Sequence, residues 1–558
     1  MVSIKDMPIG VTDFKKVRKE CYFVDKSMAI KEILEDKSEV ILLTRPRRFG
    51  KTLLLSMLDY FFAIDRKEES EHLFDGLAIE REGEKYMAQR GSRPVVFLSL
   101  KGMDAPDWAT QTEMFCHCIQ SLYQRYYAIW DSGQLRANDQ AYVERILSGE
   151  ASSVDYQRGL YSLTKLLEDF YGVKPVLLLD EYDAPIQAAY DSGYYKECIC
   201  FYRSCYNAAF KDNNHLDFAV LTGVLRVAKE SIFSGLNNLH PCPITKRDYA
   251  EACGFTLQEV QKLAEDVGRA EKLPEIKEWY DGYLFGNKEI YNPWSVINYI
   301  HADCEPQAYW MNTSANGILK KLLAHSERDR IDRLKGLLEG KPVLAHLREG
   351  LVYESIGKNE NDLYNLLFTT GYLTLQRGRN AHAALAERMV IPNKEISMVY
   401  ADEILEHLST QLGSSDFYLM LDYMLTGDGE NFEQKLQKMI REMASTFDTG
   451  ENQAESFYHG MMLGFTAMLH CNGYQVKSEG ESGYGRFDVG IFPEDQANTG
   501  VLLEFKAVKK RQSLARAAQA ARKQIETRSY IAEFAARGVA EVWKYGIAFR
   551  GKEVVLAE

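Results

Sequence analysis

The stretch of sequence that decides the fold is VILLTRPRRFGKT, residues 40–52. Its first part, Val40–Thr44, is a short apolar run without the alternation of a half-buried strand. Such runs are typical of strands that are buried on both faces of a parallel sheet. Residues 52–62, TLLLSMLDYFF, then form a helical stretch. We therefore expect a strand, a loop and a helix in direct succession, which is one unit of an α/β domain.

The loop between this strand and helix has the residue types of a phosphate-binding loop (P-loop). Backbone N–H groups at a helix N-terminus hold phosphate oxygens, while Lys51 would reach the β- and γ-phosphates and Thr52 would bind Mg²⁺. The glycine that opens the consensus motif is replaced by Arg45. Arg47 and Arg48 either face the phosphates or point to solvent. The predicted nucleotide-binding residues of this loop are Arg47, Arg48, Phe49, Gly50, Lys51 and Thr52.

A second apolar run, residues 176–180, ends in a pair of carboxylates. Asp180 at the end of this strand would hold Mg²⁺ together with Thr52, and Glu181 would orient or deprotonate the attacking water as the catalytic base. The alternative is a solvated acidic turn after a core strand.

A third run, residues 218–222, ends in Thr222. We expect its strand to lie between the P-loop strand and the acidic strand, where a polar residue can sense the γ-phosphate. Arg226 follows and would complement the phosphate charge, in the same subunit or in a neighbouring one, or would form a surface salt bridge instead. Asp180, Thr222 and Arg226 thus complete the predicted cofactor-binding set.

The chain divides into three regions by composition and pattern. With a fourth apolar run at 95–100 and helical stretches between the runs, residues 1–240 are expected to form the α/β domain with its parallel sheet. Helical patterns dominate residues 241–450, which we interpret as a lid or linker region with one hairpin near 372–376 and 388–391. Residues 451–558 are expected to fold as a third unit.

The third unit has the element order αβββαβ. Patterns predict a helix at 454–470, strands at 474–478, 487–492 and 501–507, a long helix at 513–537 and a last strand at 541–549. Asp488 lies on the second strand, and Glu504 and Lys506 lie two residues apart on one face of the third. If these strands pair, two carboxylates and one ammonium meet at one edge. Such a set can hold Mg²⁺ and activate water for phosphodiester cleavage. Glu455, on the preceding helix, would add a metal ligand.

The charge distribution favours a nucleic-acid partner for this unit. The whole chain has 67 Lys and Arg against 80 Asp and Glu, a net charge of −13, which excludes a protein that coats nucleic acid through overall charge. Residues 506–528 nevertheless contain eight basic residues and one acid, Glu526. This basic segment would bind a phosphate backbone, although a basic helix that only aids solubility is the alternative.

Other features point to a cytoplasmic protein. No apolar run approaches the 18 or so residues of a membrane span, and the first 20 residues lack the apolar core of a signal peptide. The ten cysteines contain no CxxC pair, and we expect them to be thiols rather than zinc ligands.

The motifs resemble those of a bacterial AAA-ATPase-like family, whose members are similar to STAND and archaeal-type P-loop ATPases and often carry a C-terminal PD-(D/E)XK nuclease domain. The strings that carry the resemblance are PIGVTDF (8–14), FVDKS (23–27), LTRPRRFGKT (43–52), DEYDAPI (180–186), WYDGY (279–283), YNPWSV (291–296) and YWMNTS (309–314). It covers essentially the whole chain and implies ATP and Mg²⁺ as cofactors. Tyr182, Asp183 and the aromatic residues at 279–294 would line the nucleotide base or couple the ATP state to the helical lid. The alternative is that the aromatic residues pack between domains.

The C-terminal unit resembles the PD-(D/E)XK core, a restriction-endonuclease-like fold with the same αβββαβ order. The resemblance implies that Asp488, Glu504 and Lys506 are catalytic, that Glu455 is the acidic residue of the first helix, and that Gln524 is the glutamine of several relatives. Phe487 stands where the name-giving proline would be.

Two functions from different classes remain open at this point. The first is an ATP-regulated, metal-dependent nuclease acting on DNA, for which defence or mobile-element processing would be suitable roles. The second is a STAND-like switch or assembly protein, in which ATP controls homo-oligomerisation and the C-terminal domain only binds nucleic acid. An ATP-binding protein with unrelated partners is a third option.

Overall fold

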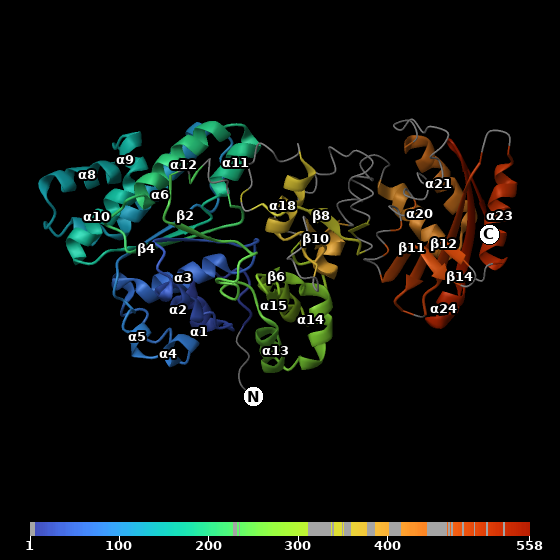
Figure 1. The fold of residues 1–558 in the computed structure, drawn as a ribbon, viewed down its shortest axis with the longest axis horizontal. Coiled ribbons are helices and arrows are strands. Elements are labelled where there is room, and N and C mark those ends of the chain that lie inside the picture. Colours follow the sequence, from blue (N-terminus) through green and yellow to red (C-terminus); the bar gives the residue numbers. More distant parts are fainter. Residues whose placement is uncertain are drawn as a thin grey trace. The chain divides into compact units, whose positions relative to one another are not determined.

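The structure is a computed structural model of the 558-residue chain. It describes residues 6–226, 232–233, 235–310, 336–337, 340–348, 350, 359–376, 386–400, 414–443, 462, 466, 469, 473–482, 485–495, 497–508, 512–527 and 531–558. Contacts divide the chain into two compact units, one of residues 1–310 and 344–393 and one of residues 311–343 and 394–558. We call them the N-terminal and the C-terminal unit and describe each by itself (Figure 1).

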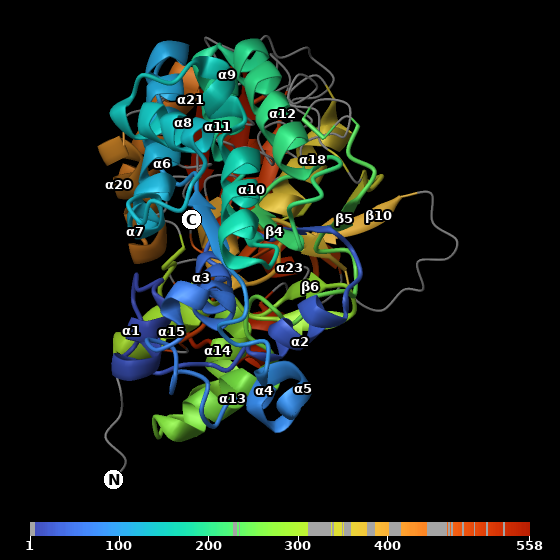
Figure 2. The same cartoon turned by 90° about the vertical axis from the view of Figure 1, so that its left-hand side faces the viewer.

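The N-terminal unit is built around a five-stranded parallel sheet with the strand order β2-β3-β4-β1-β5. Three of the apolar runs are fully or almost fully buried strands, because helices cover both faces of the sheet. Figures 1 and 2 show α1, α2 and α3 on one face and α6, α10 and α12 on the other. The five strands are β1 (Val40–Thr44), β2 (Val95–Ser99), β3 (Val176–Asp180), β4 (Phe218–Gly223) and β5 (Leu239–Cys242).

The register of these strands brings the predicted site residues to one edge of the sheet. Leu43 of β1 pairs with Thr222 of β4, and Leu179 of β3 pairs with Leu221 of β4. Strand β4 therefore lies between the P-loop strand and the acidic strand, as the sequence predicts. Strand β5 was not predicted, because its sequence, LHPC, is too short and mixed to form an apolar run.

Helices of the N-terminal unit follow the predicted stretches at their main positions. The P-loop helix α3 spans Lys51–Phe62, and the predicted stretch at 195–210 is α12, Tyr195–Phe210. The remaining helices up to the end of the sheet are α1 (Phe14–Glu20), α2 (Met28–Glu35), α4 (Ala78–Arg81), α5 (Glu84–Met87), α6 (Trp108–Arg125), α7 (Tyr127–Trp130), α8 (Ala137–Ser148), α9 (Ser153–Gln157), α10 (Gly159–Tyr171) and α11 (Ala184–Ser192), with the 3₁₀ helix η1 at Ile64–Arg66.

A smaller part of the N-terminal unit follows the sheet. Helix α13 begins after a capping box in which Thr256 and Glu259 satisfy each other's backbone N–H groups. The predicted hairpin exists, because β9 and β10 pair antiparallel. The elements are α13 (Leu257–Asp266), η2 (Ala270–Lys272), α14 (Leu273–Tyr280), β6 (Tyr283–Phe285), β7 (Lys288–Ile290), α15 (Pro293–His301), β8 (Val343–Ala345), α18 (Glu360–Thr370), β9 (Thr374–Leu375) and β10 (Glu387–Val390). The helices predicted at 318–324 and 401–412 lie outside the described residues, as does most of 329–338.

The C-terminal unit contains a five-stranded mixed sheet with the order β11-β12-β13-β14-β15. Strands β13 and β14 are parallel and the other neighbours are antiparallel. The predicted long helix is two helices, α23 and α24, and β15 is an additional strand. Most of the helix predicted at 454–470 lies outside the described residues. The elements are β11 (Tyr474–Ser482), β12 (Gly485–Pro493), β13 (Gly500–Ala507), α23 (Leu514–Thr527), α24 (Ala532–Ala536), β14 (Val542–Arg550) and β15 (Glu553–Ala557).

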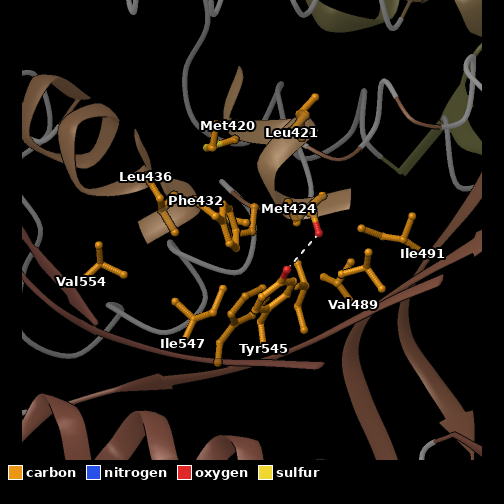
Figure 3. Packing of buried hydrophobic residues seen from close by; sticks show 14 of the residues in the cluster. Met420, Leu421, Met424, Phe432, Leu436, Val489, Ile491, Tyr545, Ile547 and Val554 are labelled. Atoms are coloured by element: carbon orange, nitrogen blue, oxygen red, sulfur yellow. Dashed lines mark hydrogen bonds between the residues drawn. The ribbon is translucent and has the colours of Figure 1, made fainter. Parts of the chain in front are cut away.

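One face of this sheet is covered by two helices that precede residue 451, α20 (Ser414–Thr426) and α21 (Gly429–Met443). Figure 3 shows side chains of these helices packed on side chains of β12, β14 and β15. The Tyr545 hydroxyl also donates to the Met424 carbonyl at 3.1 Å. Helices α20 and α21 are therefore part of the C-terminal core, so the range 241–450 is divided between the two units. The three-part division at 240 and 450 stays a sequence-based prediction.

Helix α21 also satisfies backbone groups of β15, the last strand of the sheet, and of the turn that precedes it. The Gln437 amide donates to the Lys552 carbonyl at 2.7 Å and accepts the Val554 N–H at 3.0 Å. The Glu433 carboxylate accepts the Leu556 N–H at 2.6 Å. Edge strands with unpaired N–H and C=O groups are sites of unwanted strand pairing, and these side chains block that pairing.

Two simpler expectations can be compared with the structure directly. Each cysteine that the structure describes is a free thiol. Of the helices in the described ranges, none has both the length and the apolar composition needed to cross a membrane.

We expect Phe432→Ala to destabilise the C-terminal unit by about 3–5 kcal/mol, because it opens a cavity in the cluster between the helices and the sheet. Phe432 is fully buried, with its ring centroid 5.3 Å from that of Tyr545. The matched control is Tyr418→Ala on α20, whose side chain is 54% exposed and should cost less than about 0.5 kcal/mol. Thermal or urea unfolding of the full chain measures both; equal effects would contradict the assigned packing.

Candidate functional site

The P-loop has the backbone geometry of an anion-binding turn. Gly50, with φ +89°, is the residue before α3 and lies in the left-handed region that favours glycine. Arg48 also has a positive φ, +70°. The first intrahelical hydrogen bond runs from the Leu54 N–H to the Gly50 carbonyl at 3.0 Å. The N–H groups of residues 51–53 precede it, so the helix offers the unpaired donors and the positive end of its dipole to a phosphate.

Lys51 is folded into this loop. Its ammonium donates to the carbonyls of Arg45 and Pro46, at 3.0 and 2.8 Å. The side chain is buried, and burial lowers the pKa of Lys51, an effect that Asp180 and Asp183 partly offset. A buried cation held mainly by neutral carbonyls is strongly stabilised by an anionic partner, and a phosphate would be such a partner.

Asp180, the last residue of β3, is hydrogen-bonded to predicted site residues from α3 and from β4. One carboxylate oxygen accepts the Thr52 hydroxyl at 2.7 Å, and the other accepts the Thr222 hydroxyl at 2.5 Å. Asp180 is fully buried. A threonine hydroxyl and a carboxylate at hydrogen-bond distance are oxygen donors of the type Mg²⁺ prefers, so these residues fit that ion.

Glu181 follows in a strained turn, with φ +53°. Partial burial and the neighbouring Asp180 raise the pKa of Glu181, while Lys51 and Lys101 oppose the shift. A raised pKa brings a carboxylate nearer to the range in which it accepts a proton from water efficiently.

Arg45, at the position of the consensus glycine, is buried and hydrogen-bonded to backbone carbonyls. Its guanidinium donates to the carbonyls of Thr44 (2.9 Å), Cys242 (2.7 Å) and Tyr249 (2.8 Å), and it lies 5.2 Å from the Phe285 ring. The side chain is 1% exposed. Arg45 therefore ties the end of β1 to the end of β5 and to the segment after it. The sequence shows that Arg45 departs from the consensus, but it does not show that Arg45 links these segments.

The other predicted nucleotide-binding residues differ in their surroundings. Phe49 is buried against Tyr283 and Phe285, so its side chain packs on β6 and only its backbone is available to a phosphate. Arg47 donates to Gln187 at 3.2 Å. The Arg48 guanidinium lies 4.1 Å from the centroid of the Trp294 ring. Arg226 is half-buried and directly precedes residues outside the description.

The carboxylates of the C-terminal unit come together as the strand pairing predicts. Val489 pairs with Leu503, and the same antiparallel register places Asp488 opposite Glu504. The Asp488 carboxylate accepts the Phe505 N–H at 2.6 Å. The Lys506 ammonium lies 3.6 Å from Glu504 Oε1. Asp488, Glu504 and Lys506 thus meet at one place.

Glu504 is the carboxylate of this site whose pKa burial raises. It is 1% exposed, and burial together with the neighbouring Asp488 raises the pKa of Glu504 to about 7. Oε1 accepts a hydrogen bond from the Gln524 amide, whereas Oε2 is buried with no hydrogen-bond partner among the described residues. A buried oxygen of this kind is costly. The carboxylates of Asp488 and Glu504, including the unpartnered oxygen of Glu504, are suitable ligands for a divalent cation.

Gln524 reaches Glu504 because α23 lies very close to the sheet. Gly546, the β14 partner of Glu504, has no side chain to separate the helix from the sheet. A Cβ there would be 2.3 Å from the Ala518 carbonyl oxygen and from the Arg522 backbone nitrogen. The resemblance, not the pattern, singled out Gln524, and no feature of the pattern pointed to Gly546.

Parts of the predicted site lie outside the described residues. They include Glu455 and, from the basic segment, Lys509, Lys510, Arg511 and Arg528. Arg516 and Lys523 are exposed on α23, whereas Arg522 pairs with Glu526 at 2.9 Å. Within the described ranges, no group of three or more His, Cys, Asp or Glu side chains is arranged to hold a metal ion.

Comparison with known proteins gives these two sites their class. Residues 8–233 match the family described as "Predicted AAA-ATPase", and residues 453–558 match the PD-(D/E)XK nuclease superfamily. The chain thus carries an AAA-ATPase-like domain followed by a PD-(D/E)XK nuclease superfamily domain, and the resemblance inferred from its motifs is confirmed.

A relative of similar length extends the likeness beyond these domains. It is 26% identical over 555 residues, which cover 96% of this chain and 95% of the relative, and it is described as "Uncharacterized protein in vnfD 5'region" of Azotobacter chroococcum mcd 1. No solved structure matches the chain.

We expect Arg45→Gly, which restores the consensus glycine, to destabilise the N-terminal unit by on the order of 3 kcal/mol. It leaves the carbonyls of Cys242 and Tyr249 buried without their donor. Arg47→Gly, a change of the same kind at a half-buried neighbour, is the control and should cost less. Unfolding curves of both variants test this; a gain in stability on Arg45→Gly would contradict the anchoring role.

We expect the stability of the metal-free chain to fall as pH rises from about 4.5 to about 7, with a contribution from Glu504. Its pKa is higher in the folded than in the unfolded state, so the folded state binds more protons in this window and loses stability as Glu504 ionises. Glu504→Gln should flatten this slope, by up to about 1.4 kcal/mol per pH unit. Glu526→Gln on the exposed side of α23 is the control. An unchanged slope in Glu504→Gln would show that Glu504 titrates normally.

Proposed function

We propose that the chain binds and hydrolyses ATP and that its C-terminal domain is a metal-dependent nuclease that cuts DNA phosphodiesters. The observation that carries the proposal is that each domain brings the residues of its chemistry to one place. Asp180 accepts hydrogen bonds from the hydroxyls of Thr52 and Thr222. Asp488, Glu504 and Lys506 lie together, and one carboxylate oxygen of Glu504 is buried with no hydrogen-bond partner among the described residues.

At the ATP site, the proposed roles follow from the contacts. The N–H groups at the start of α3 bind the phosphates, and Lys51 exchanges its loop carbonyls for phosphate oxygens. Thr52 and Asp180 would hold Mg²⁺, which shields the phosphate charge when bound. Glu181 orients water and accepts its proton, a role suited to its raised pKa. Thr222 and Arg226 face the γ-phosphate.

At the nuclease site, Asp488 and Glu504 would hold the metal ion, which polarises the scissile phosphate when bound. Glu455 is proposed as a further ligand. Lys506 is partly exposed and lies beside Glu504, where its ammonium stabilises the negative charge that develops on the phosphate. Gln524 orients Glu504 through its amide. Arg516 and Lys523, both exposed on α23, are proposed to contact the DNA backbone.

A second candidate is a switch or assembly protein in which ATP controls homo-oligomerisation and the C-terminal domain only binds nucleic acid. One observation favours it. Asp488 is engaged by the Phe505 N–H, and the described residues contain no third carboxylate at the site, so the metal ligands on hand are few. Defence or mobile-element processing would suit the nuclease, and regulated assembly would suit the switch.

The deciding experiment incubates plasmid DNA with the protein and Mg²⁺, with and without ATP, and measures phosphate release in parallel. We expect Lys51→Ala to abolish ATP turnover and Lys506→Ala to abolish DNA cleavage while ATP turnover persists. Lys37→Ala and Lys552→Ala, exposed lysines of the two units, are matched controls that should leave both activities intact. ATP turnover without cleavage by the unaltered protein would overturn the nuclease proposal and favour the switch. Cleavage without ATP turnover would overturn the ATPase assignment.

A further inference from the structure

The turn after β3 and the segment after β4 are joined by a set of hydrogen bonds that have no role in the ATP site as described above. The Asp183 carboxylate accepts the N–H groups of Val224 and Leu225, at 2.9 and 2.7 Å. The Tyr182 hydroxyl donates to the Leu225 carbonyl, and the Tyr182 N–H donates to the Thr222 carbonyl at 3.0 Å. We call this set the β3–β4 latch.

The latch lies deep in the N-terminal unit. Asp183 is 4% exposed and Tyr182 is fully buried. The packing leaves no room between the two segments, because a Cβ on Gly223 would be 2.5 Å from Asp183 Oδ1 and from Tyr182 Cε1. The Gly223 carbonyl, on the other side, accepts the Arg45 N–H of the P-loop at 3.1 Å. The segment after β4 is thus bonded to the acidic turn and to the P-loop at once.

Two of the three carboxylates at the end of β3, Asp180 and Asp183, have different tasks as a result. Asp180 faces the hydroxyls of Thr52 and Thr222, where a nucleotide would be bound. Asp183 faces the backbone of residues 224–225, which connects Thr222 to Arg226. Two buried N–H groups on one carboxylate oxygen are charge-assisted hydrogen bonds, which are about twice as strong as neutral ones.

We propose that Asp183 is a positioning residue for recognition of the γ-phosphate: through Val224 and Leu225 it holds Thr222 and Arg226 at the edge of the sheet. The proposal rests on the ATP binding proposed above. Without the latch, the N–H groups of the P-loop still hold the α- and β-phosphates and Lys51 still reaches the β-phosphate, so binding of ADP persists. The protein would lose its discrimination between a triphosphate and a diphosphate, because Thr222 and Arg226, the residues placed toward the third phosphate, are held by the latch.

The test measures the equilibrium affinity of the full chain for AMP-PNP and for ADP, each with Mg²⁺. We expect Asp183→Ala to lower the preference for AMP-PNP over ADP on the order of tenfold, while ADP affinity changes by less than about threefold. Gly223→Ala should do the same by another route, since its methyl group forces the segments apart. Asp107→Ala is the matched control. It removes a carboxylate that accepts a backbone N–H at the start of α6, at 2.9 Å, and should leave the preference unchanged.

Each result has one meaning. If Asp183→Ala and Gly223→Ala keep the preference, or if Asp183→Ala weakens both nucleotides equally, the positioning role is wrong although the protein binds ATP. If the unaltered protein binds neither nucleotide, the proposed function fails, and this inference fails with it. Tyr182→Phe, which loses only the hydroxyl that donates to Leu225, decides the matter if the other variants do not fold. It should lower the preference in the same direction, and an unchanged preference would overturn the proposal.

Discussion

The carboxylate of Asp180, hydrogen-bonded on one side to Thr52 and on the other to Thr222, is the interaction on which the N-terminal unit depends for its chemistry. It can form only if β4 separates β1 from β3 and if all three strands run in the same direction, so that their ends coincide. The parallel sheet, its burial beneath helices on both faces and the left-handed turn at Gly50 all serve this meeting point. Because Asp180 is fully buried, its charge acts at low dielectric, where a small displacement of either hydroxyl has a large energetic effect.

The carboxylates of Asp180 and Glu504 differ in how completely they are hydrogen-bonded. Both oxygens of Asp180 have hydroxyl partners, so that site is internally satisfied and must exchange partners to admit an ion. Glu504 has one oxygen bonded to Gln524 and one with no hydrogen-bond partner among the described residues, and burial raises its pKa to about 7. A proton can relieve that second oxygen, and so can a cation. If Glu504 holds a metal ion as proposed, that ion replaces a proton, whereas an ion at Asp180 replaces hydrogen bonds to Thr52 and Thr222.

Much of this organisation could be predicted from the sequence, for identifiable reasons. Continuous apolar runs reveal strands buried on both faces, and a polar residue at the end of such a run marks the active edge, so Thr52, Asp180 and Thr222 could be placed together. The period of a strand likewise puts Glu504 and Lys506 on one face. Contacts between distant segments leave no periodic signal. Arg45 binds the carbonyl of Cys242, Asp183 binds the amides of Val224 and Leu225, and Gly546 admits α23 to the sheet. The hydrophobic cluster that joins α20 and α21 to the sheet was not predicted, because the expected division at 450 assigns these helices and the sheet to different regions.

The side chains of Gln437 and Glu433 have a consequence for how this domain can be inherited. They occupy the backbone positions of β15 that a further strand would use, and they belong to a helix that precedes the matched nuclease region, 453–558. A gene fusion that joined only the matched region to another protein would leave behind the helix that closes the sheet. Recombination that keeps this edge of the sheet covered must carry α21 with it, together with α20, which packs on the same face. The heritable module therefore starts at least some 40 residues before the region that similarity defines.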